Sequence, residues 1–256
     1  MDDFYLDETG LAAYFEMQWL DKLRANGVHE PLSKTVPDRF ILTSHAPYVA
    51  NLIAQTLKAH HISPNSLLEI GPSLGRNCYE LIEQCPSLSE ITVVEPSARL
   101  LEQFKRILID GTECQFSYIK SLHQLGQLPF VTKHLAEACQ HIDFTIINAP
   151  FTSHITSHQF DLTVCLNVLD QCESPNDIVN ALMQATAPKG VLVLSCTYQW
   201  NKKHLADLNA GVDDINDYFD QQWIKLAEDE VEYKIRLNER CSYLFLSHVV
   251  IYRKSA

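Results

Sequence analysis

The sequence has no excess of basic residues and no long apolar run. Its 20 lysine and arginine residues are outnumbered by 32 aspartate and glutamate residues, giving a formal net charge of -12. Nucleic acids and anionic membranes bind clustered basic side chains, so we expect neither as a partner. No apolar run approaches the roughly 18 residues that cross a bilayer, and the acidic N-terminus lacks the apolar core of a signal peptide. These absences predict a soluble, cytoplasmic protein that binds small molecules or peptides.

A paired cysteine motif is also absent. The eight cysteines are scattered and contain no C-x-x-C pair, which fits neither a disulfide framework nor a zinc site. His154 and His158 are four residues apart, but they lie in a segment that reads as a loop. We therefore expect reduced cytosolic thiols and no bound metal.

Periodic apolar patterns divide the 256 residues into two parts. Residues 11–24 and 48–61 place apolar side chains three and four apart, which predicts helices and no strand in an N-terminal segment, or lid, over residues 1–62. Short apolar runs then alternate with helical patterns from Leu67 onward, as in successive strand–helix–strand units. Residues 63–256 are thus predicted to form one domain.

The C-terminal half adds further elements to this pattern. Buried strands are predicted at 142–149, 160–169 and 191–196, whereas residues 111–141 fit no clear pattern. Residues 201–232 are acidic and are interpreted as a helical insertion, and the runs 231–237 and 242–254 predict an antiparallel hairpin. The predicted fold class is α/β: a Rossmann-like, doubly wound, mostly parallel sheet with a C-terminal antiparallel hairpin and an N-terminal helical segment.

The segment Gly71-Pro72-Ser73-Leu74-Gly75 permits two incompatible readings. It spells G-x-S-x-G, the nucleophile elbow of an α/β-hydrolase. That elbow normally follows several strands and an oxyanion loop, whereas here it would follow the first strand. The alternative is a glycine loop between a strand and a helix, which binds a nucleotide-like cofactor through free N–H groups at the helix start.

Glu95 and the spacing of the two glycines favour the cofactor loop. Glu95 ends the next strand, roughly 20 residues on, where an acidic side chain binds ribose hydroxyls. Gly71 and Gly75 occupy the outer glycine positions, but Ser73 replaces the middle glycine. A dinucleotide needs very close backbone approach at that position, so the serine disfavours NAD and FAD. S-adenosylmethionine, which has no phosphate, leaves room for the side chain.

With these features the segment resembles the class I S-adenosylmethionine-dependent methyltransferases, whose first motif is an acidic residue followed by glycines at alternate positions. Asn148-Ala149 ends the third strand, at the position where that family contacts adenine. The resemblance covers most of residues 65–200 and implies S-adenosyl-L-methionine as the cofactor. The cofactor-binding residues that it implies are Glu69, Gly71, Pro72, Ser73, Gly75, Glu95, Pro96, Asn148, Ala149 and Leu166.

A second methyltransferase motif is a weaker match. Residues 148–151 read N-A-P-F and differ from the N-P-P-Y type motif of amino-group methyltransferases by Ala149 and by the exchange of one aromatic residue for another at Phe151. That assignment would make the strand beginning at Phe160 one strand too late, and an acidic chain is a poor nucleic-acid binder.

The residues after the fourth strand indicate the acceptor. The segment CLNVLDQC resembles histidine N-methyltransferases, and N-V-L-D-Q resembles the ovothiol-pathway enzymes that methylate a thiolated histidine. Asn167 and Asp170 are three residues apart and can point to one side. An oxygen of either could accept the N–H of a neutral imidazole and leave the other nitrogen free to attack. The alternative is that Asn167 caps the turn and Asp170 caps the following helix.

The C-terminal third strengthens the ovothiol-pathway resemblance. Residues 195–200, which include Tyr198, and the closing segment from 235 onward are similar to that family. Tyr198 is therefore grouped with Asn167 and Asp170 as a catalytic candidate, and Arg236 or Arg240 could pair with an amino-acid carboxylate or with the acidic segment. The resemblance implies an N-methyltransferase for a small histidine derivative. A peptide histidine, another small molecule, or cofactor binding without catalysis are the alternatives.

Overall fold

A computed structural model describes residues 7–25, 45–152, 158–201, 205, 207, 211–238 and 240–256. Its centre is a seven-stranded sheet with the strand order β5-β2-β1-β6-β7-β9-β8. The strands are β1 (Ser66–Ile70), β2 (Glu90–Val94), β5 (Asp143–Ile147), β6 (Phe160–Leu166), β7 (Thr186–Cys196), β8 (Trp223–Arg236) and β9 (Ser242–Lys254). The first five pair in parallel, and β9 runs antiparallel to both of its neighbours. The predicted mostly parallel sheet and C-terminal hairpin are confirmed.

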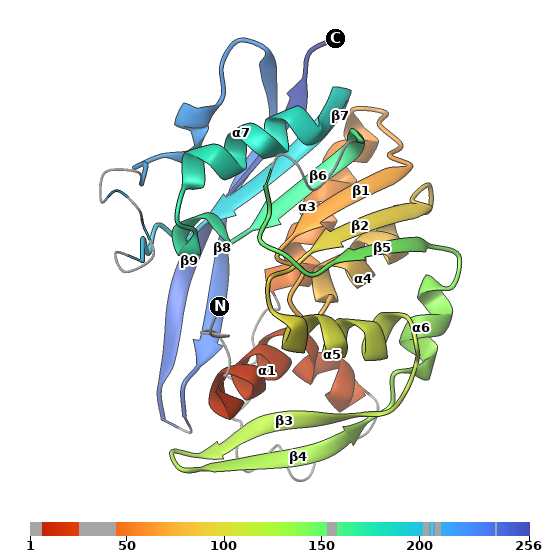
Figure 1. Cartoon of the computed structure of the whole chain (residues 1–256), viewed down its shortest axis with the longest axis vertical. Coiled ribbons are helices and arrows are strands. Elements are labelled where there is room, and N and C mark those ends of the chain that lie inside the picture. Colours follow the sequence, from red (N-terminus) through yellow and green to blue (C-terminus); the bar gives the residue numbers. More distant parts are fainter. Residues whose placement is uncertain are drawn as a thin grey trace.

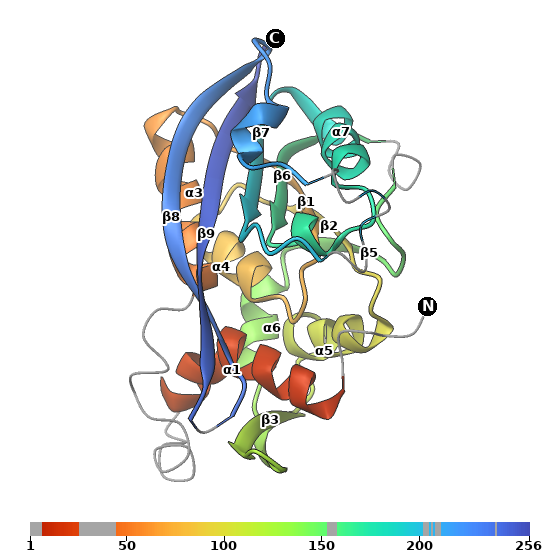
Figure 2. The same cartoon turned by 90° about the vertical axis from the view of Figure 1, so that its left-hand side faces the viewer.

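Helices cover both faces of this sheet (Figures 1 and 2). One apolar cluster joins the sheet to α3 (His45–Ala59), α4 (Arg76–Gln84) and α5 (Ala98–Leu108), and a second joins the opposite face to α7 (Pro175–Ala185). Two short 3₁₀ turns, η2 (Leu169–Gln171) and η3 (Ile215–Tyr218), follow β6 and precede β8. The doubly wound arrangement places the carboxyl ends of β1, β2, β5, β6 and β7 along one edge, where ligands bind in such folds.

The N-terminal helix α1 (Glu8–Ala25) packs onto the segment that follows β1. Trp19 is fully buried and donates from Nε1 to the Leu74 carbonyl at 3.2 Å. The Arg76 guanidinium, also buried, donates to both carboxylate oxygens of Asp21 at 2.6 and 2.7 Å. α1 therefore fixes the loop between β1 and α4, and the predicted N-terminal helices are confirmed as α1 and α3.

Residues 111–141, which fit no clear pattern in the sequence, form a hairpin and a helix. The hairpin consists of β3 (Cys114–Ser121) and β4 (Gln124–Phe130), and it forms a separate two-stranded sheet next to α1 (Figure 1). The helix α6 (Lys133–Cys139) follows and leads into β5. Phe116 and Phe130 bury their rings under α1, so the hairpin extends the core beyond the main sheet.

The helical interpretation of residues 201–232 is wrong from residue 223 onward. These residues form β8, which pairs with β9 from Trp223 to Arg236 and is an edge strand. Edge strands carry charged side chains that face water, so the acidic composition of this strand resembles that of a surface helix. In the described part of the chain, no helix combines the length and apolar character required to cross a bilayer.

Candidate functional site

The loop after β1 makes a tight turn that requires two glycines. Gly71 and Gly75 have φ values of 69° and 83°, and a Cβ on Gly71 would lie 2.5 Å from Cγ2 of Val168. The Gly71 N–H donates to the Val94 carbonyl at 3.0 Å, and the Gly75 N–H donates to the carbonyl of the buried Pro72 at 2.9 Å. The loop thereby touches both the end of β2 and the turn after β6.

Two buried polar atoms in this loop and the adjoining helical turn have no hydrogen-bond partner among the described residues: Ser73 Oγ and Asn77 Oδ1. Ser73 also has a φ of 52°, in the left-handed region that serine rarely adopts. A nucleophile elbow would need a histidine on the Ser73 hydroxyl, and the described residues supply none. The structure therefore gives no support to the hydrolase reading.

Glu69, in β1, holds the loop in place through hydrogen bonds from α4. Its carboxylate is 3% exposed and accepts from Asn77 Nδ2 at 2.9 Å and from Cys78 Sγ at 2.5 Å. Burial raises the pKa of this carboxyl. Both oxygens have partners in the first turn of α4, so Glu69 fixes the helix start relative to β1.

One of the N–H groups at the start of α4, which we expected to be free, is already hydrogen-bonded within the protein. The Arg76 N–H donates to Gln18 Oε1 of α1 at 3.3 Å, so this donor already has a partner. α1 thus supplies an external cap for a helix that has no side-chain cap of its own.

Glu95 and Asn148 lie at the neighbouring strand ends. Glu95 directly follows β2, is 6% exposed, and accepts the Ser97 N–H at 3.0 Å. Asn148 directly follows β5 and donates from Nδ2 to the carbonyls of Glu95 and Pro96 at 2.9 and 3.0 Å. Asn148 and the adjacent half-buried Ala149 therefore sit beside the loop that begins at Glu95.

The Asn167 amide, just after the half-buried Leu166 that ends β6, has its oxygen occupied. Asn167 has a φ of 53°, and its Oδ1 accepts from Ser195 Oγ at 3.1 Å and from Ser247 Oγ at 2.6 Å. Its Nδ2 lies 3.5 Å from Nε2 of His45. Asn167 therefore presents N–H groups, and its oxygen is unavailable for the predicted role of accepting an imidazole N–H.

Asp170, in η2, is 2% exposed and also has partners within the protein. Its Oδ2 accepts from Thr197 Oγ1 at 2.6 Å and its Oδ1 accepts from Gln171 Nε2 at 3.3 Å. Burial raises the pKa of this carboxyl. The pair of oxygens predicted to hold the acceptor is thus used to fix the turn after β6 instead.

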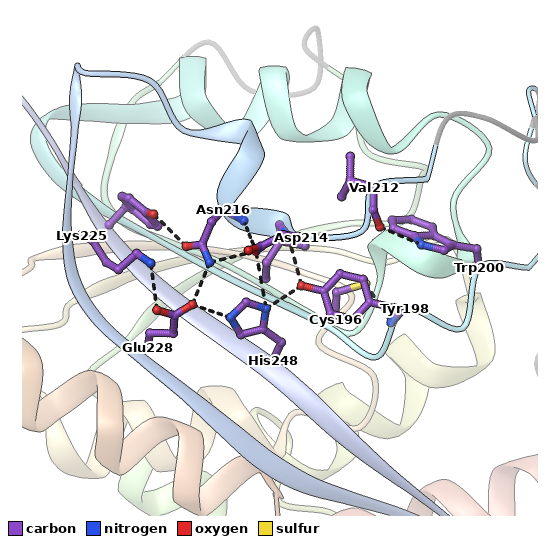
Figure 3. A network of polar contacts seen from close by, with 11 residues as sticks. Cys196, Tyr198, Trp200, Val212, Asp214, Asn216, Lys225, Glu228 and His248 are labelled. Atoms are coloured by element: carbon purple, nitrogen blue, oxygen red, sulfur yellow. Dashed lines mark hydrogen bonds and ion pairs between the residues drawn. The ribbon is translucent and has the colours of Figure 1, made fainter.

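Tyr198 belongs to a different polar network, shown in Figure 3. Its hydroxyl lies 2.5 Å from His248 Nδ1 and accepts the Ile215 N–H at 3.1 Å, while His248 Nε2 lies 2.7 Å from Glu228. Asn216 and Lys225 bind the same carboxylate at 2.7 and 2.8 Å. His248 and Ser247 are adjacent on β9 and point to opposite faces of the sheet.

This alternation separates Tyr198 from the Asn167 amide. Ser247, on the α3 face, binds Asn167, whereas His248, on the α7 face, binds Tyr198. The network ties η3 to the hairpin β8–β9, and burial raises the pKa of Tyr198 to about 12. The structure therefore does not bring Tyr198 together with Asn167.

Arg236 is buried and pairs with α1, contrary to both predicted partners. It donates from Nε and Nη2 to the Glu16 carboxylate at 2.5 and 2.6 Å and also donates to the Ile119 carbonyl. An incoming carboxylate would have to displace Glu16. No ion pair joins Arg240 to another residue that the structure describes, and His154 lies outside the described residues.

Two residues near the site were not predicted from the sequence. His45, the first residue of α3, is 8% exposed, and burial lowers its pKa to about 4. Tyr14 of α1 is partly buried, and burial together with the charges of Glu95 and Asp170 raises its pKa to about 12. The helical pattern located both helices, but which side chains meet the strand ends depends on packing between distant segments.

Sequence comparisons identify no relatives: no family model matches the chain, and no curated protein matches it in sequence. Solved structures do resemble it. N-methyltransferase NodS from Bradyrhizobium japonicum WM9, in complex with S-adenosyl-L-homocysteine, gives a TM-score of 0.51 at 17% identity, over 94% of this chain and 99% of NodS. The magnesium protoporphyrin IX methyltransferase ChlM from Synechocystis PCC 6803, with bound SAM, gives 0.51 at 13% identity over 98% of both chains.

TehB from Haemophilus influenzae gives a TM-score of 0.54 at 11% identity, over 83% of this chain and 68% of TehB. At these identities the likeness concerns the arrangement of helices and strands. The chain therefore has the Rossmann-like fold of class I methyltransferases.

Proposed function

We propose that the chain is an S-adenosylmethionine-dependent methyltransferase that binds its cofactor at the carboxyl ends of β1, β2 and β5. Methyltransferases of this fold include NodS and ChlM, whose structures contain S-adenosylhomocysteine and S-adenosylmethionine. The glycine loop, the buried Glu95 and Asn148 lie at the strand ends that such a ligand occupies in an open α/β sheet.

The observation that carries this proposal is the pair of unpartnered atoms, Ser73 Oγ and Asn77 Oδ1. Buried side-chain polar atoms nearly always have a hydrogen-bond partner, and an exception needs an explanation. A polar ligand in the loop supplies one. The amino-acid part of S-adenosylmethionine carries an ammonium that can donate to Asn77 and a carboxylate that can accept from the Ser73 hydroxyl.

The remaining loop residues fit the same ligand. The Glu95 carboxylate, at the end of β2, is placed to accept from ribose hydroxyls. Gly71, Pro72 and Gly75 shape the turn, and Pro96 and Ala149 flank the proposed adenine position next to Asn148. Glu69 and Leu166 act less directly, through α4 and through β6.

When bound, S-adenosylmethionine supplies a methyl group on a sulfonium. The acceptor's lone pair would form the new bond to the methyl carbon as the sulfur–carbon bond breaks, which would release S-adenosylhomocysteine as a neutral thioether. An imidazole acceptor would then carry the positive charge and release its N–H proton to water. The protein's contribution is to orient the lone pair and exclude competing water.

For the acceptor, we propose an imidazole nitrogen of a small histidine derivative. The support is the similarity of residues 165–172 and 195–200 to histidine and thiohistidine N-methyltransferases. A peptide histidine or a different small molecule would use the same edge of the sheet, and cofactor binding without transfer is the alternative from outside this class.

Calorimetric titration tests the cofactor. We expect S-adenosylmethionine and S-adenosylhomocysteine to bind, and Glu95→Gln to weaken binding roughly tenfold or more, because a charge-assisted hydrogen bond to ribose is lost. Glu90→Gln is the matched control, since Glu90 begins the same strand and is exposed at its opposite end. Equal affinities in the two variants would remove the cofactor assignment.

Product analysis tests the acceptor. The release of S-adenosylhomocysteine is measured with 5-thiohistidine, free histidine and histidine-containing peptides, and the methylated nitrogen is located by NMR. Turnover of 5-thiohistidine alone supports the proposed acceptor, turnover of peptides supports the protein acceptor, and binding without turnover supports the non-catalytic alternative.

A further inference from the structure

The turn after β6 contains a hydrogen-bond chain whose donors and acceptors can be assigned. The Asn167 backbone N–H donates to the Ser195 carbonyl at 3.0 Å and to Ser195 Oγ at 3.1 Å, and the Ser195 hydroxyl in turn donates to Asn167 Oδ1 at 3.1 Å. Ser247 Oγ donates to the same oxygen at 2.6 Å. With both hydroxyls donating to this oxygen, the other side of the Asn167 amide is its NH₂ group.

This assignment fixes the state of His45. Its Nε2 faces Asn167 Nδ2, a donor, and this arrangement favours a lone pair on Nε2 and the ring proton on Nδ1. Burial, which lowers the pKa of His45 to about 4, keeps the imidazole uncharged at neutral pH. The edge of its ring packs against Tyr233 of β8, with centroids 5.2 Å apart, which fixes the ring's orientation.

The lone pair on His45 Nε2 receives only a weak hydrogen bond. Its distance to Asn167 Nδ2 is 3.5 Å, longer than the 2.7–3.2 Å of a normal N–H···N or N–H···O bond, and His45 is 8% exposed. A buried acceptor with so weak a donor is ready to receive a better one. The Asp170 carboxylate and the Asn167 oxygen, by contrast, are already occupied.

The position of this lone pair relates it to the proposed cofactor loop. Asn167 follows β6, the strand next to β1 in the sheet. The next residue, Val168, lies against Gly71 of the loop, where a Cβ would come within 2.5 Å of Val168 Cγ2. The His45–Asn167 pair is thus at the carboxyl edge of the sheet, beside the loop that would hold the methyl donor.

We infer that His45 Nε2 is the hydrogen-bond acceptor that orients the methyl acceptor, and that it binds an uncharged N–H group. This inference rests on the proposed function and names the part of the site that selects its substrate. A neutral imidazole that donates its N–H to His45 presents its other ring nitrogen as a lone pair for methyl transfer. His45 takes no proton in this step, and the N–H proton leaves to water after transfer.

The test uses His45→Phe, which keeps an aromatic ring without a lone pair, and His45→Gln, which restores an acceptor oxygen. His134→Phe is the matched control, because His134 is exposed on α6. We expect His45→Phe to keep the wild-type affinity for S-adenosylmethionine and to raise the KM for 5-thiohistidine or histidine roughly three- to tenfold, with partial recovery in His45→Gln. An unchanged KM in His45→Phe would overturn the inference.

Nitrogen-15 NMR of His45 gives a readout without turnover. In the cofactor-free protein, Nε2 should show the signal of an unprotonated imidazole nitrogen, and a protonated Nε2 overturns the inference directly. In the presence of S-adenosylhomocysteine, 5-thiohistidine or histidine should shift this signal, and no shift with either also counts against the inference. Failure of the wild type to bind S-adenosylmethionine is a separate result, which overturns the proposed function.

Discussion

Replacing Gly71 with alanine tests whether the loop shape depends on contact with the turn after β6. The φ of 69° costs an L-residue about 1–2 kcal/mol, and the new Cβ would lie 2.5 Å from Cγ2 of Val168, an overlap typical of overpacking that costs about 1–3 kcal/mol. The sum is roughly 2–5 kcal/mol. For a chain of this size, that corresponds to a fall in Tm of roughly 4–20 °C.

The two contributions can be separated with variants of the same chain. Gly111→Ala imposes a similar φ of 60° with its nearest neighbour at 3.1 Å, so it should show mainly the backbone cost. Val168→Ala removes Cγ2, so Gly71→Ala should cost less in that background than in the wild type. Denaturant unfolding of the wild type, Gly71→Ala, Val168→Ala and the double variant gives the coupling energy between the two positions. A Gly71→Ala cost that equals that of Gly111→Ala and is unchanged in the Val168→Ala background would refute the contact.

Four further results are expected. Glu16→Gln removes the carboxylate that pairs with the buried Arg236 and should cost about 3–5 kcal/mol in urea unfolding, whereas replacing both by leucine should cost far less; equal costs would contradict this. Tyr198→Phe should lower stability by about 1–3 kcal/mol but leave the affinity for S-adenosylmethionine unchanged, as calorimetry would show. Hydrogen bonds from Lys225, Asn216 and His248 lower the pKa of Glu228 to about 2, below its ordinary 4.5. The stabilisation from this carboxylate should therefore be present above pH 4.5 and be lost as the pH falls toward 2. Unfolding of Glu228→Gln, measured across this pH range, should lack this dependence. His45 has the same dependence in a higher pH range. Its folded pKa of about 4 lies below the ordinary 6.5, so the unfolded chain binds more protons, and stability should fall by about 1.4 kcal/mol per pH unit as the pH falls from 6.5 to 4, a slope missing in His45→Gln.

The sheet and the cofactor loop could be predicted because both depend on local order in the sequence. Strand and helix periods differ, and parallel strands connected by helices bring Glu95 and Asn148 to the edge that Gly71 occupies. These residues directly follow β2, β5 and β1, as expected. Each position follows from the residues within one strand–turn unit, without knowledge of which distant segments touch.

The acceptor side could not be predicted in the same way. His45 and Asn167 are 122 residues apart, and Glu16 and Arg236 are 220 apart. Asn167 and Asp170 have the residue types that suit an imidazole acceptor, but residue type does not reveal that serine and threonine hydroxyls already occupy their oxygens. Hydrogen-bond saturation is a property of the packed site.

The N-terminal segment therefore contributes more than a cover. α1 caps α4 through Gln18, buries Trp19 against the glycine loop, and pairs Glu16 with β8, while α3 begins with the imidazole that faces Asn167. Buried contacts of this kind are those of a core element, since they cannot open without exposing apolar surface and separating buried charges. We therefore infer that the proposed cofactor loop and the proposed acceptor subsite both depend on residues before 62, and that the sheet with its own helices would not form a complete site.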